Sequence, residues 1–324
     1  MLEAVFVVCL GRSQRSAPDS VMIQTDASYF RIEAGIKTRQ QLCQATIAYE
    51  RGGRKKIAID GVTAKARELY EQFCVVSSGP EDSSIVSGPP SVRRNFLNVY
   101  ISQLSSRYLS DLTDYHKALA QKNAALRNNM DPAPFDPQVI AYGARVTQAR
   151  SAFLSDLGSA AATYYRMISD DEQLHVAYKP SVAVAEEHSD LVDIETAFRV
   201  RVEDSLERER VLQTALVGPH RDEVQFDIGG QPARSHGSQG QWRTAAVSLK
   251  LAVYGLLKEK RGMAPLLLLD EVFAELDDRR VDALVGALDG FSQLFLTTAQ
   301  DPPEALLASG RSYRLASGRI EEIL

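Results

Sequence analysis

The chain has 324 residues, of which 44% are hydrophobic and 24% are charged, and its formal net charge is -5. This is the composition of an ordinary globular protein with room for two domains of usual size. The negative balance excludes a global basic field, so any binding of nucleic acid would depend on a local patch.

The apolar runs and the cysteines indicate the cellular compartment and whether disulfides or zinc stabilise the fold. No segment approaches the roughly 18 apolar residues that a membrane helix needs, and the apolar start "AVFVVCLG" lacks the flanks of a secretory signal. The three cysteines, Cys9, Cys43 and Cys74, show no CxxC or Cys/His spacing. We therefore expect a reduced, cytoplasmic protein without structural disulfides or structural zinc.

The first elements are a helix and an antiparallel meander. The segment "MLEAVFVVCLGRS" has helical content from its first residue, without the Ser, Thr, Asp or Asn cap that usually precedes a helix. It therefore looks as though it begins in the middle of a domain. Between residues 21 and 60, four segments separated by turn residues predict strands: "VMIQT", "YFRIEAGI", "QATIAYE" and "KKIAIDG".

The middle of the chain has helical periodicity. Apolar residues recur every three or four positions between Phe96 and Leu119, which predicts one helix of roughly ten turns. Two further stripes predict long helices, from Val139 to Tyr164 and from Leu191 to Leu212. Helices of this length that pack on one another indicate a separate helical lobe.

Strands and helices alternate again after residue 218. We expect strands and helices in the following order: strand 222–228, helix 243–260, strand 266–271, helix 280–288, strand 293–298 and a terminal hairpin turning at residues 317–318.

The order of these elements predicts the domain organisation. Sheet elements flank the helices in sequence, so the simplest architecture is one α/β domain formed from both chain ends. Residues 1–90 and 215–324 would form this domain, and residues 91–214 would form an inserted helical lobe.

An acidic pair follows the most apolar strand. In "LLLLDEVFAELDD", four leucines lead to Asp270 and Glu271, at the carboxyl end of a strand buried on both faces. Asp270 is a candidate Mg²⁺ ligand, direct or through water, because this ion prefers oxygen ligands and keeps several waters. Glu271 is a candidate for orienting or deprotonating an attacking water in phosphoryl transfer. The alternative is an acidic pair that only ends a strand at the surface.

A glycine-rich loop precedes the helix at 243–260. Gly237 and Gly240 bracket Ser238 and Gln239 in "GSQGQ". Such a loop presents backbone N–H groups and the positive end of a helix to an anion, and Ser238 adds a hydroxyl. The alternative is an ordinary turn in which Ser238 is only the N-cap.

Basic residues mark the start of the helical lobe. Arg93 and Arg94 lie in the first turn of a helix, where positive charge is unfavourable for the helix dipole. The pair therefore indicates a contact with a carboxylate, a phosphate or the neighbouring lobe, and a solvated basic face is the alternative. Together with Arg107 and Lys117, these residues are the candidate contacts to DNA phosphates.

A histidine cluster stands before the strand at 222–228. His220, Arg221 and Asp222 adjoin one another in "GPHRDEV", and no second histidine stands at metal-ligand spacing. We therefore expect a structural hydrogen-bonded cluster rather than a metal site.

Several segments carry a family pattern in combination. "LEAVFVVCLGRSQR", "PEDSSIVSGPPSVRRNFLNVY", "GPHRDEV", "GSQGQWRTAAVSLKLA" and "LLLLDEVFAELD" follow one another along essentially the whole chain. In this order they resemble the RecF family of bacterial recombination mediators. The resemblance implies an α/β fold of the ABC-ATPase type, in the SMC-like branch. Its head, formed from both chain ends, has a mixed sheet plus an antiparallel β meander, and a long-helix lobe is inserted.

The resemblance also assigns roles to residues. Asp270 and Glu271 match the Walker B pair. The ABC signature loop, which acts on the γ-phosphate of ATP held by the partner subunit, is matched by Ser238, Gln239, Gly240 and Gln241.

Two further positions match parts of the family pattern. Glu275, Leu276 and Asp277 match the D-loop, which crosses the dimer interface. Thr297 and Thr298 fall where many ABC proteins have a switch histidine, which RecF-like proteins often lack.

The implied activity is a slow ATP hydrolysis. ATP and Mg²⁺ would be the cofactors, and an ATP-dependent homodimer would clamp single-stranded or gapped DNA beside other recombination mediator proteins. This work would lead to recombinase loading and the SOS response. One alternative is a non-catalytic DNA- or protein-binding module with a degenerate ATPase head. Another is an unrelated α/β metal hydrolase that uses Asp270 and Glu271, which has no need of a signature loop.

The sequence departs from the family pattern in three places. Asn98 stands where the family usually has Asp, and Trp242 stands where Gln is common. The phosphate loop GxxxxGK[ST] is missing, since no Gly-Lys dipeptide occurs in the chain. In the family this loop would end immediately before Leu2, so Met1 looks like an internal methionine or an artificial start; natural loss of the loop is the alternative.

Without the loop, we expect the chain as written to bind ATP poorly or not at all. The backbone N–H groups and the lysine that balance the phosphate charge are missing from it. Titration calorimetry is the measurement, and binding in the micromolar range would contradict the expectation.

Overall fold

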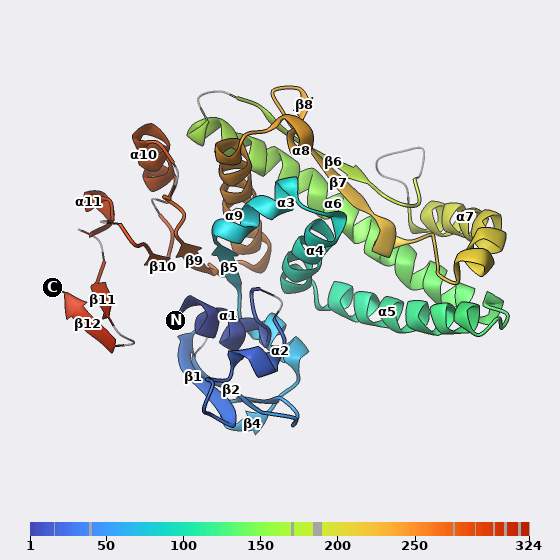
Figure 1. Cartoon of the computed structure of the whole chain (residues 1–324), viewed down its shortest axis with the longest axis horizontal. Helices are drawn as coiled ribbons and strands as arrows, with labels where there is room; N and C mark the ends of the chain where they lie inside the picture. Colours follow the sequence, from blue (N-terminus) through green and yellow to red (C-terminus); the bar gives the residue numbers. More distant parts are fainter. Residues whose placement is uncertain are drawn as a thin grey trace.

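The computed structural model describes residues 1–15, 17–38, 41–169, 172–183, 190–274, 276–288, 290–300, 302–307, 310–316 and 319–323. A small sheet near the N-terminus, a central sheet with its covering helices and a group of long helices make up most of the molecule, and the last strands lie at the opposite side from the long helices (Figure 1).

Helix α1 (Leu2–Leu10) and an antiparallel sheet form the N-terminal part. Its strands pair in chain order: β1 (Tyr29–Lys37), β2 (Leu42–Glu50), β3 (Lys56–Ile59) and β4 (Val62–Thr63). The predicted meander is thus confirmed for its last three segments. The prediction of a strand at "VMIQT" is wrong, because Pro18 with its fixed φ leads into a 3₁₀ turn, η1 (Asp19–Met22).

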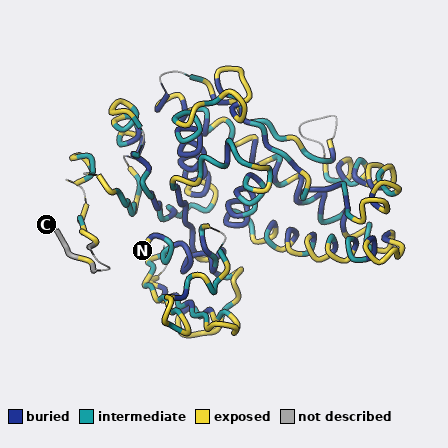
Figure 2. The backbone as a smooth tube through the Cα atoms, viewed as in Figure 1, coloured by how far each residue is buried: buried dark blue, intermediate teal, exposed yellow. Residues whose placement is uncertain are grey.

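A parallel sheet forms the centre of the molecule. Its strand order is β10 (Leu294–Thr297), β9 (Leu266–Asp270) and β5 (Val75–Ser78). Both α1 and α9 (Gln239–Arg261) pack on β5, and Figure 2 shows buried backbone concentrated in this region. A strand covered on both faces must be apolar throughout, which explains the leucine run before Asp270.

Two smaller sheets complete the strands. One has the order β6 (Leu174–Lys179), β7 (Glu223–Ile228) and β8 (Gln231–Pro232), and the other is a hairpin of β11 (Ser312–Ala316) and β12 (Arg319–Ile323). The hairpin was predicted, although its turn at residues 317–318 lies outside the described residues. Strand β6 was not predicted, since its short alternating pattern stands between two long helices.

The first long helix of the lobe is interrupted. The prediction of one helix through Phe96 and Leu119 is wrong, because the chain forms α4 (Pro90–Leu104) and α5 (Ser106–Arg127). Ser105 between them is extended, with φ -144° and ψ 111°, and its side chain accepts from the N–H of Tyr108. Ser105 therefore caps α5 and sets it off from α4.

The other predicted lobe helices are present. They are α6 (Asp136–Ile168) and α7 (Leu191–Leu212). A Cβ at Gly143 would lie 2.6 Å from Cε2 of Phe198, so the absence of a side chain there lets α7 approach α6 closely. Short helices connect the larger elements: α2 (Ala66–Gln72), η2 (Pro80–Ser83), α3 (Ser84–Ser87), η3 (Ala133–Phe135), η4 (Pro219–Arg221), α8 (Ala233–His236), α10 (Asp278–Ala287) and α11 (Glu304–Leu307).

Two apolar clusters form the core. The larger one joins α1, the central sheet and α9 to α4 and to the C-terminal half of α6. The smaller one lies among the distal parts of α5, α6 and α7: Tyr115, Ala118, Val139, Ile140, Val182, Phe198, Val202 and Val217. The first cluster and the β6–β7 pairing both cross the boundaries at residues 90/91 and 214/215, so the division into a head and a lobe at those positions stays a prediction.

Candidate functional site

The carboxyl end of β9 carries the acidic pair. Leu267, Leu268 and Leu269 are fully buried, and Asp270 follows them at the sheet edge. Thr297 is paired with Asp270 in the neighbouring strand β10, and its Oγ1 donates to Oδ1 of Asp270 across 2.5 Å. Thr297 thus fixes the orientation of the candidate Mg²⁺ ligand.

Glu271 has a left-handed backbone. Its φ is 50°, and its N–H donates to the carbonyl oxygen of Thr297 across 3.0 Å. A left-handed conformation at a residue other than glycine costs about 1–3 kcal/mol, and such conformations gather at functional sites. The side chains of Asp270 and Glu271 are therefore separated both by the alternation of side chains along the strand and by the backbone turn at Glu271.

A cavity of about 600 Å³ opens beside Asp270. Residues of β5, η2, α4 and α9 line it, among them Ser77, Asp82, Asn95 and Lys250. Gly79 lies against the acidic residue, since a Cβ on it would be 3.5 Å from Cβ of Asp270. Glu81 also lines this cavity, and the carboxylate of Asp82 is bonded to Lys250 and to the N–H of Gly79. The carboxylate of Asp270 beside a cavity fits Mg²⁺, which keeps most of its ligands as water and phosphate oxygen.

Sequence reasoning missed Lys250, which lies within this cavity wall. Only 5% of the residue is exposed, and its Nζ donates to the carbonyl oxygen of Ser77 (2.6 Å), to Oδ1 of Asp82 (2.9 Å) and to the hydroxyl of Tyr100 (3.2 Å). Burial alone would lower the pKa of Lys250, but Asp82 and Tyr100 raise it above its ordinary value. The ammonium thus stays charged and joins β5, η2 and α4.

This arrangement leaves Lys250 no capacity for a phosphate. An ammonium has three N–H donors, and all three have acceptors here. It does not replace the lysine of a GxxxxGK[ST] loop. The only sequence indication of its role was a charged residue inside the otherwise apolar run "AAVSLKLAVY".

The glycine-rich loop caps α9 as the sequence indicated. Oγ of Ser238 accepts from the N–H of Gln241 (3.2 Å), and Oε1 of Gln241 accepts from the N–H of Ser238 (2.8 Å). This is a capping box, so the N-cap alternative is correct as a description of the fold. The box uses Ser238 Oγ as an acceptor and leaves its hydroxyl proton for a further partner. The N–H groups of Gln239 and Gly240 have no intrahelical acceptor.

The loop is connected to the turn after the acidic pair. Nη1 of Arg243 donates to the carbonyl oxygen of Ala274 across 2.6 Å, and a Cβ at Gly240 would lie 2.9 Å from Nη1 of Arg280. Asp277 caps α10 through the N–H of Arg280 at 3.0 Å, and its side chain is 62% exposed. Glu275 of the predicted D-loop lies outside the described residues.

The predicted DNA contacts divide into buried and exposed residues. Arg93 is 3% exposed, and its guanidinium donates to Oε1 (2.5 Å) and Oε2 (2.8 Å) of Glu223 and to the carbonyl oxygens of Ile85, Val86 and Gly88. The prediction of a phosphate contact at Arg93 is therefore corrected, because its donors serve a carboxylate and the carbonyl groups of α3 and its C-cap.

The other three candidates remain at or near the surface. Arg94 is half-buried and donates to the carbonyl oxygen of Asp222 (2.9 Å). The side chains of Arg107 and Lys117 on α5 are 79% and 69% exposed, with only an i,i+4 or i,i+3 carboxylate nearby. Exposed pairs of this kind are weak, so both side chains are free to reach a phosphate.

The histidine cluster is structural, as predicted. Nε2 of His220 lies 3.0 Å from the carbonyl oxygen of Ala215, so this nitrogen carries the proton. Nδ1 is then the acceptor for the hydroxyl of Tyr115, at 2.6 Å. Arg221 also donates to Ala215, and Asp222 pairs with Arg150. The cluster thus fastens η4 to α5 and α6.

This histidine should make stability depend on pH. Burial lowers the pKa of His220 from 6.5 to about 4, and nearby Arg221 acts in the same direction. The unfolded chain therefore binds the proton first. We expect the free energy of unfolding to be unaffected by this group above about pH 6.5. As the pH falls from about 6.5 to about 4, it should decrease by about 3 kcal/mol.

The check is the unfolding free energy at several pH values. His220→Gln, which keeps a donor and an acceptor but cannot titrate, should have a flatter profile between pH 4 and 6.5. Equal slopes for the variant and the unsubstituted chain would contradict the prediction.

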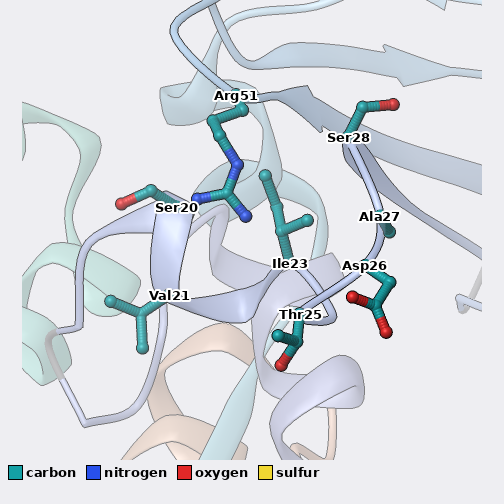
Figure 3. A pocket seen from close by; sticks show the side chains of 8 residues that line it. All are labelled: Ser20, Val21, Ile23, Thr25, Asp26, Ala27, Ser28 and Arg51. Carbon is teal, nitrogen blue, oxygen red and sulfur yellow. The ribbon is translucent and has the colours of Figure 1, made fainter.

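A second hollow, of about 770 Å³, is lined by η1, by the segment between η1 and β1, and by Arg51. Figure 3 shows its lining side chains, which include one carboxylate, Asp26, and one guanidinium, Arg51. None of the residues proposed from the sequence lines it. We assign it no role.

Other site classes find no support in the described part of the chain. Those residues contain no group of three or more His, Cys, Asp or Glu side chains that is able to hold a metal ion. Cys9, Cys43 and Cys74 are free and buried, and burial raises the pKa of Cys9 to about 12. In the same part of the chain, no helix has the length and apolar character that crossing a membrane requires.

Comparison with known proteins identifies the family. No family model matches the chain. It is 36% identical over 307 residues to the DNA replication and repair protein RecF of Halalkalibacterium halodurans, which covers 92% of this chain and 82% of the relative. The chain belongs to the RecF family. The RecF of Staphylococcus aureus strain JH9 is 31% identical over 331 residues, covering 99% of this chain and 89% of that protein.

Solved structures agree with this membership. The recombination mediator protein RecF with ATP, in the RecFOR pathway, superposes with a TM-score of 0.90 at 30% identity, covering 100% of this chain and 87% of that one. The Smc head domain of Pyrococcus yayanosii, at 10% identity and a TM-score of 0.54, shares the fold. The predicted ABC/SMC-head-like α/β fold and the family are therefore confirmed, and the chain is a RecF-type DNA replication and repair protein.

Proposed function

We propose that this RecF chain binds single-stranded or gapped DNA as a homodimer of the ATP-dependent clamp type, with an ATP site that is incomplete in this chain because the phosphate loop is missing. One observation carries the proposal. By resemblance, the acidic pair after β9 and the loop that caps α9 match two parts of a composite nucleotide site, but none of Ser238, Gln239, Gly240 and Gln241 lines the cavity beside Asp270. Parts of one site that do not share a cavity within a chain fit a site completed by a second copy.

The residues have distinct roles in such a dimer. Asp270, oriented by Thr297, would hold Mg²⁺, which neutralises charge on phosphate oxygens when bound. Glu271 orients the attacking water and accepts its proton. The free hydroxyl proton of Ser238 and the N–H groups at the start of α9 face the γ-phosphate on the partner subunit, and Asp277 lies at the subunit contact.

We further propose that the clamp works at single-strand gaps with other recombination mediators, upstream of recombinase loading and the SOS response. The support is the RecFOR pathway named for the similar RecF structure. The cytoplasm is the corresponding compartment.

The DNA surface is tested by salt dependence. We expect the affinity for a labelled single-stranded oligonucleotide, measured by fluorescence anisotropy, to fall steeply between about 50 and 200 mM salt. In Arg107→Gln and Lys117→Gln the logarithmic slope should decrease by about 0.7 each, because each variant releases one counterion fewer.

Lys258→Gln is the matched control, since it removes an exposed charge near the end of α9. Its slope should equal that of the unsubstituted chain. Salt-insensitive binding, or equal effects of all three substitutions, would contradict a phosphate-binding surface on α5.

A second function is favoured by one feature, the lack of GxxxxGK[ST] in the chain. In that case the chain is a DNA- or protein-binding module with an inactive ATPase head. The same anisotropy assay with and without ATP and Mg²⁺ separates the two. ATP-strengthened binding supports the clamp, and ATP-independent binding supports the module.

A further inference from the structure

A short hydrogen-bonded relay connects the lobe to the loop at the start of α9. The hydroxyl of Tyr165, in the last turn of α6, donates to Oε2 of Glu172 across 2.9 Å. The other carboxylate oxygen, Oε1, accepts from Nε2 of Gln241 across 2.8 Å. Glu172 therefore lies between a lobe helix and the signature loop and binds both.

The carboxylate decides how the Gln241 amide is oriented. An ionised carboxylate is only an acceptor, so the NH₂ end of the amide must face Glu172. The oxygen end is then directed to the N–H of Ser238, which donates to it across 2.8 Å. A reversed amide would present two donors to each other at Ser238 and break the capping box.

The Tyr165 end of the relay is equally fixed. Burial raises the pKa of Tyr165 well above its ordinary value, and the bond to Glu172 acts in the same direction, so the phenol remains a donor. Ser169, one turn later, donates to the carbonyl oxygen of Tyr165 and accepts from the N–H of Glu172. A displacement of the end of α6 is thus carried to Glu172.

We propose that Glu172 is a positioning residue that sets the conformation of the signature loop and couples it to the lobe through Tyr165. The proposal rests on the function proposed above, in which the loop meets a nucleotide on a second copy. When the end of α6 moves, the Gln241 amide moves with Glu172. The capping box then loosens, and the Ser238 hydroxyl loses its fixed direction.

The chain contains its own reporter for this loop. Trp242 is its single tryptophan, adjoins Gln241, and donates from Nε1 to the carbonyl oxygen of Ala233 across 2.7 Å. Its fluorescence and the amide exchange of Ser238, Gln241 and Trp242 need neither nucleotide nor DNA. Failure of the proposed function would therefore not affect this test, and failure of this test would not affect the salt experiment.

The test compares Glu172→Ala, Glu172→Gln and Tyr165→Phe with the unsubstituted chain. Loss of a hydrogen bond to a charged group should increase exchange at the bonded amides of Ser238, Gln241 and Trp242 by about 10- to 100-fold in Glu172→Ala, with greater acrylamide quenching of Trp242. Glu172→Gln should restore both readouts, because its amide oxygen accepts from Gln241 and its NH₂ can donate to Tyr165. Tyr165→Phe should have an intermediate effect.

Glu207→Ala is the matched control, since its side chain on α7 is 86% exposed. It should change neither readout. The proposal is overturned if Glu172→Ala leaves the exchange and the quenching unchanged. It is also overturned if Glu172→Gln behaves like Glu172→Ala, or if the exchange rises equally in α9 as a whole, which would indicate general destabilisation.

Discussion

Asp222→Ala is expected to lower the free energy of unfolding by about 3–5 kcal/mol, because it leaves a buried guanidinium without its counter-charge. Arg150 and Asp222 have side chains that are 2% and 1% exposed, and Nη1 lies 2.7 Å from Oδ2. Urea unfolding followed by far-ultraviolet circular dichroism, with linear extrapolation, gives the free energy.

The carboxylate also organises its neighbours. The hydroxyl of Tyr178 donates to Oδ2 of Asp222 across 2.5 Å, and the N–H of Ser181 donates to Oδ1 across 2.9 Å. Alanine at this position therefore leaves three donors unsatisfied at once, from α6, β6 and the segment after it. An unsatisfied buried donor adds about 1–3 kcal/mol of its own, so the effect lies at the upper end of the range.

Asn98 offers a compensating change. Its Oδ1 accepts from Nη2 of Arg150 (2.8 Å) and from the hydroxyl of Tyr108 (3.0 Å). Adding Asn98→Asp to Asp222→Ala returns one carboxylate to the guanidinium. We expect this second substitution to recover part of the lost stability, whereas two independent sites would show no such coupling.

Asp114→Ala is the control for Asp222→Ala. Its partner Lys117 is 69% exposed, so the change should stay within about 0.5 kcal/mol. A loss below 1 kcal/mol in Asp222→Ala would show that Arg150 does not depend on this carboxylate and would refute the prediction.

Local patterns in the sequence were sufficient for much of the fold and for the elements that carry the candidate site residues. The leucine run before Asp270 predicted a buried strand because a parallel sheet demands apolar residues on both faces. The glycines around Ser238 predicted a loop at a helix start. Both features are set by neighbours in the chain, so a single sequence reveals them.

Features that depend on distant partners were not predictable in this way. The apolar period runs without interruption from Leu104 to Tyr108, because both flanks of the break at Ser105 pack inward. The local sequence around Arg93 is compatible with a phosphate or a carboxylate as its partner. The carboxylate that Arg93 binds belongs to Glu223, which is 130 residues away in the chain. Lys250 likewise bonds Ser77 at a separation of 173 residues. Hydrophobic periodicity indicates which face of an element is buried, but it does not indicate which partner a buried polar side chain binds.

Lys122→Met should destabilise the distal part of the lobe while leaving the central sheet folded. The Lys122 side chain is 1% exposed, and its Nζ lies 2.8 Å from Oε2 of Glu209, which is 0% exposed, and 2.8 Å from Oδ1 of Asp136. Methionine has a similar volume but leaves two carboxylates without a cation. The expected loss is about 3–5 kcal/mol, borne by the contacts among α5, α6 and α7.

The separation of the two apolar clusters makes this loss local. The smaller cluster lies at the distal ends of the three lobe helices, and Glu209 also accepts from the N–H of Leu216, which closes the segment after α7. Regions with their own core open as units. Amide exchange in α7 should therefore rise about 100-fold or more in Lys122→Met, and exchange in α9 should hardly change.

Lys117→Met, on an exposed face of the same helix, is the control and should leave both helices unchanged. A uniform rise in α7 and α9 would show that the molecule opens as one unit and would contradict a lobe with independent stability. If α7 alone opens, DNA affinity measured on Lys122→Met becomes informative. Arg107 lies on α5 before the smaller cluster, whereas Lys117 lies between its members Tyr115 and Ala118. Retained affinity would therefore place the contact at the start of α5, and lost affinity would require the folded distal part.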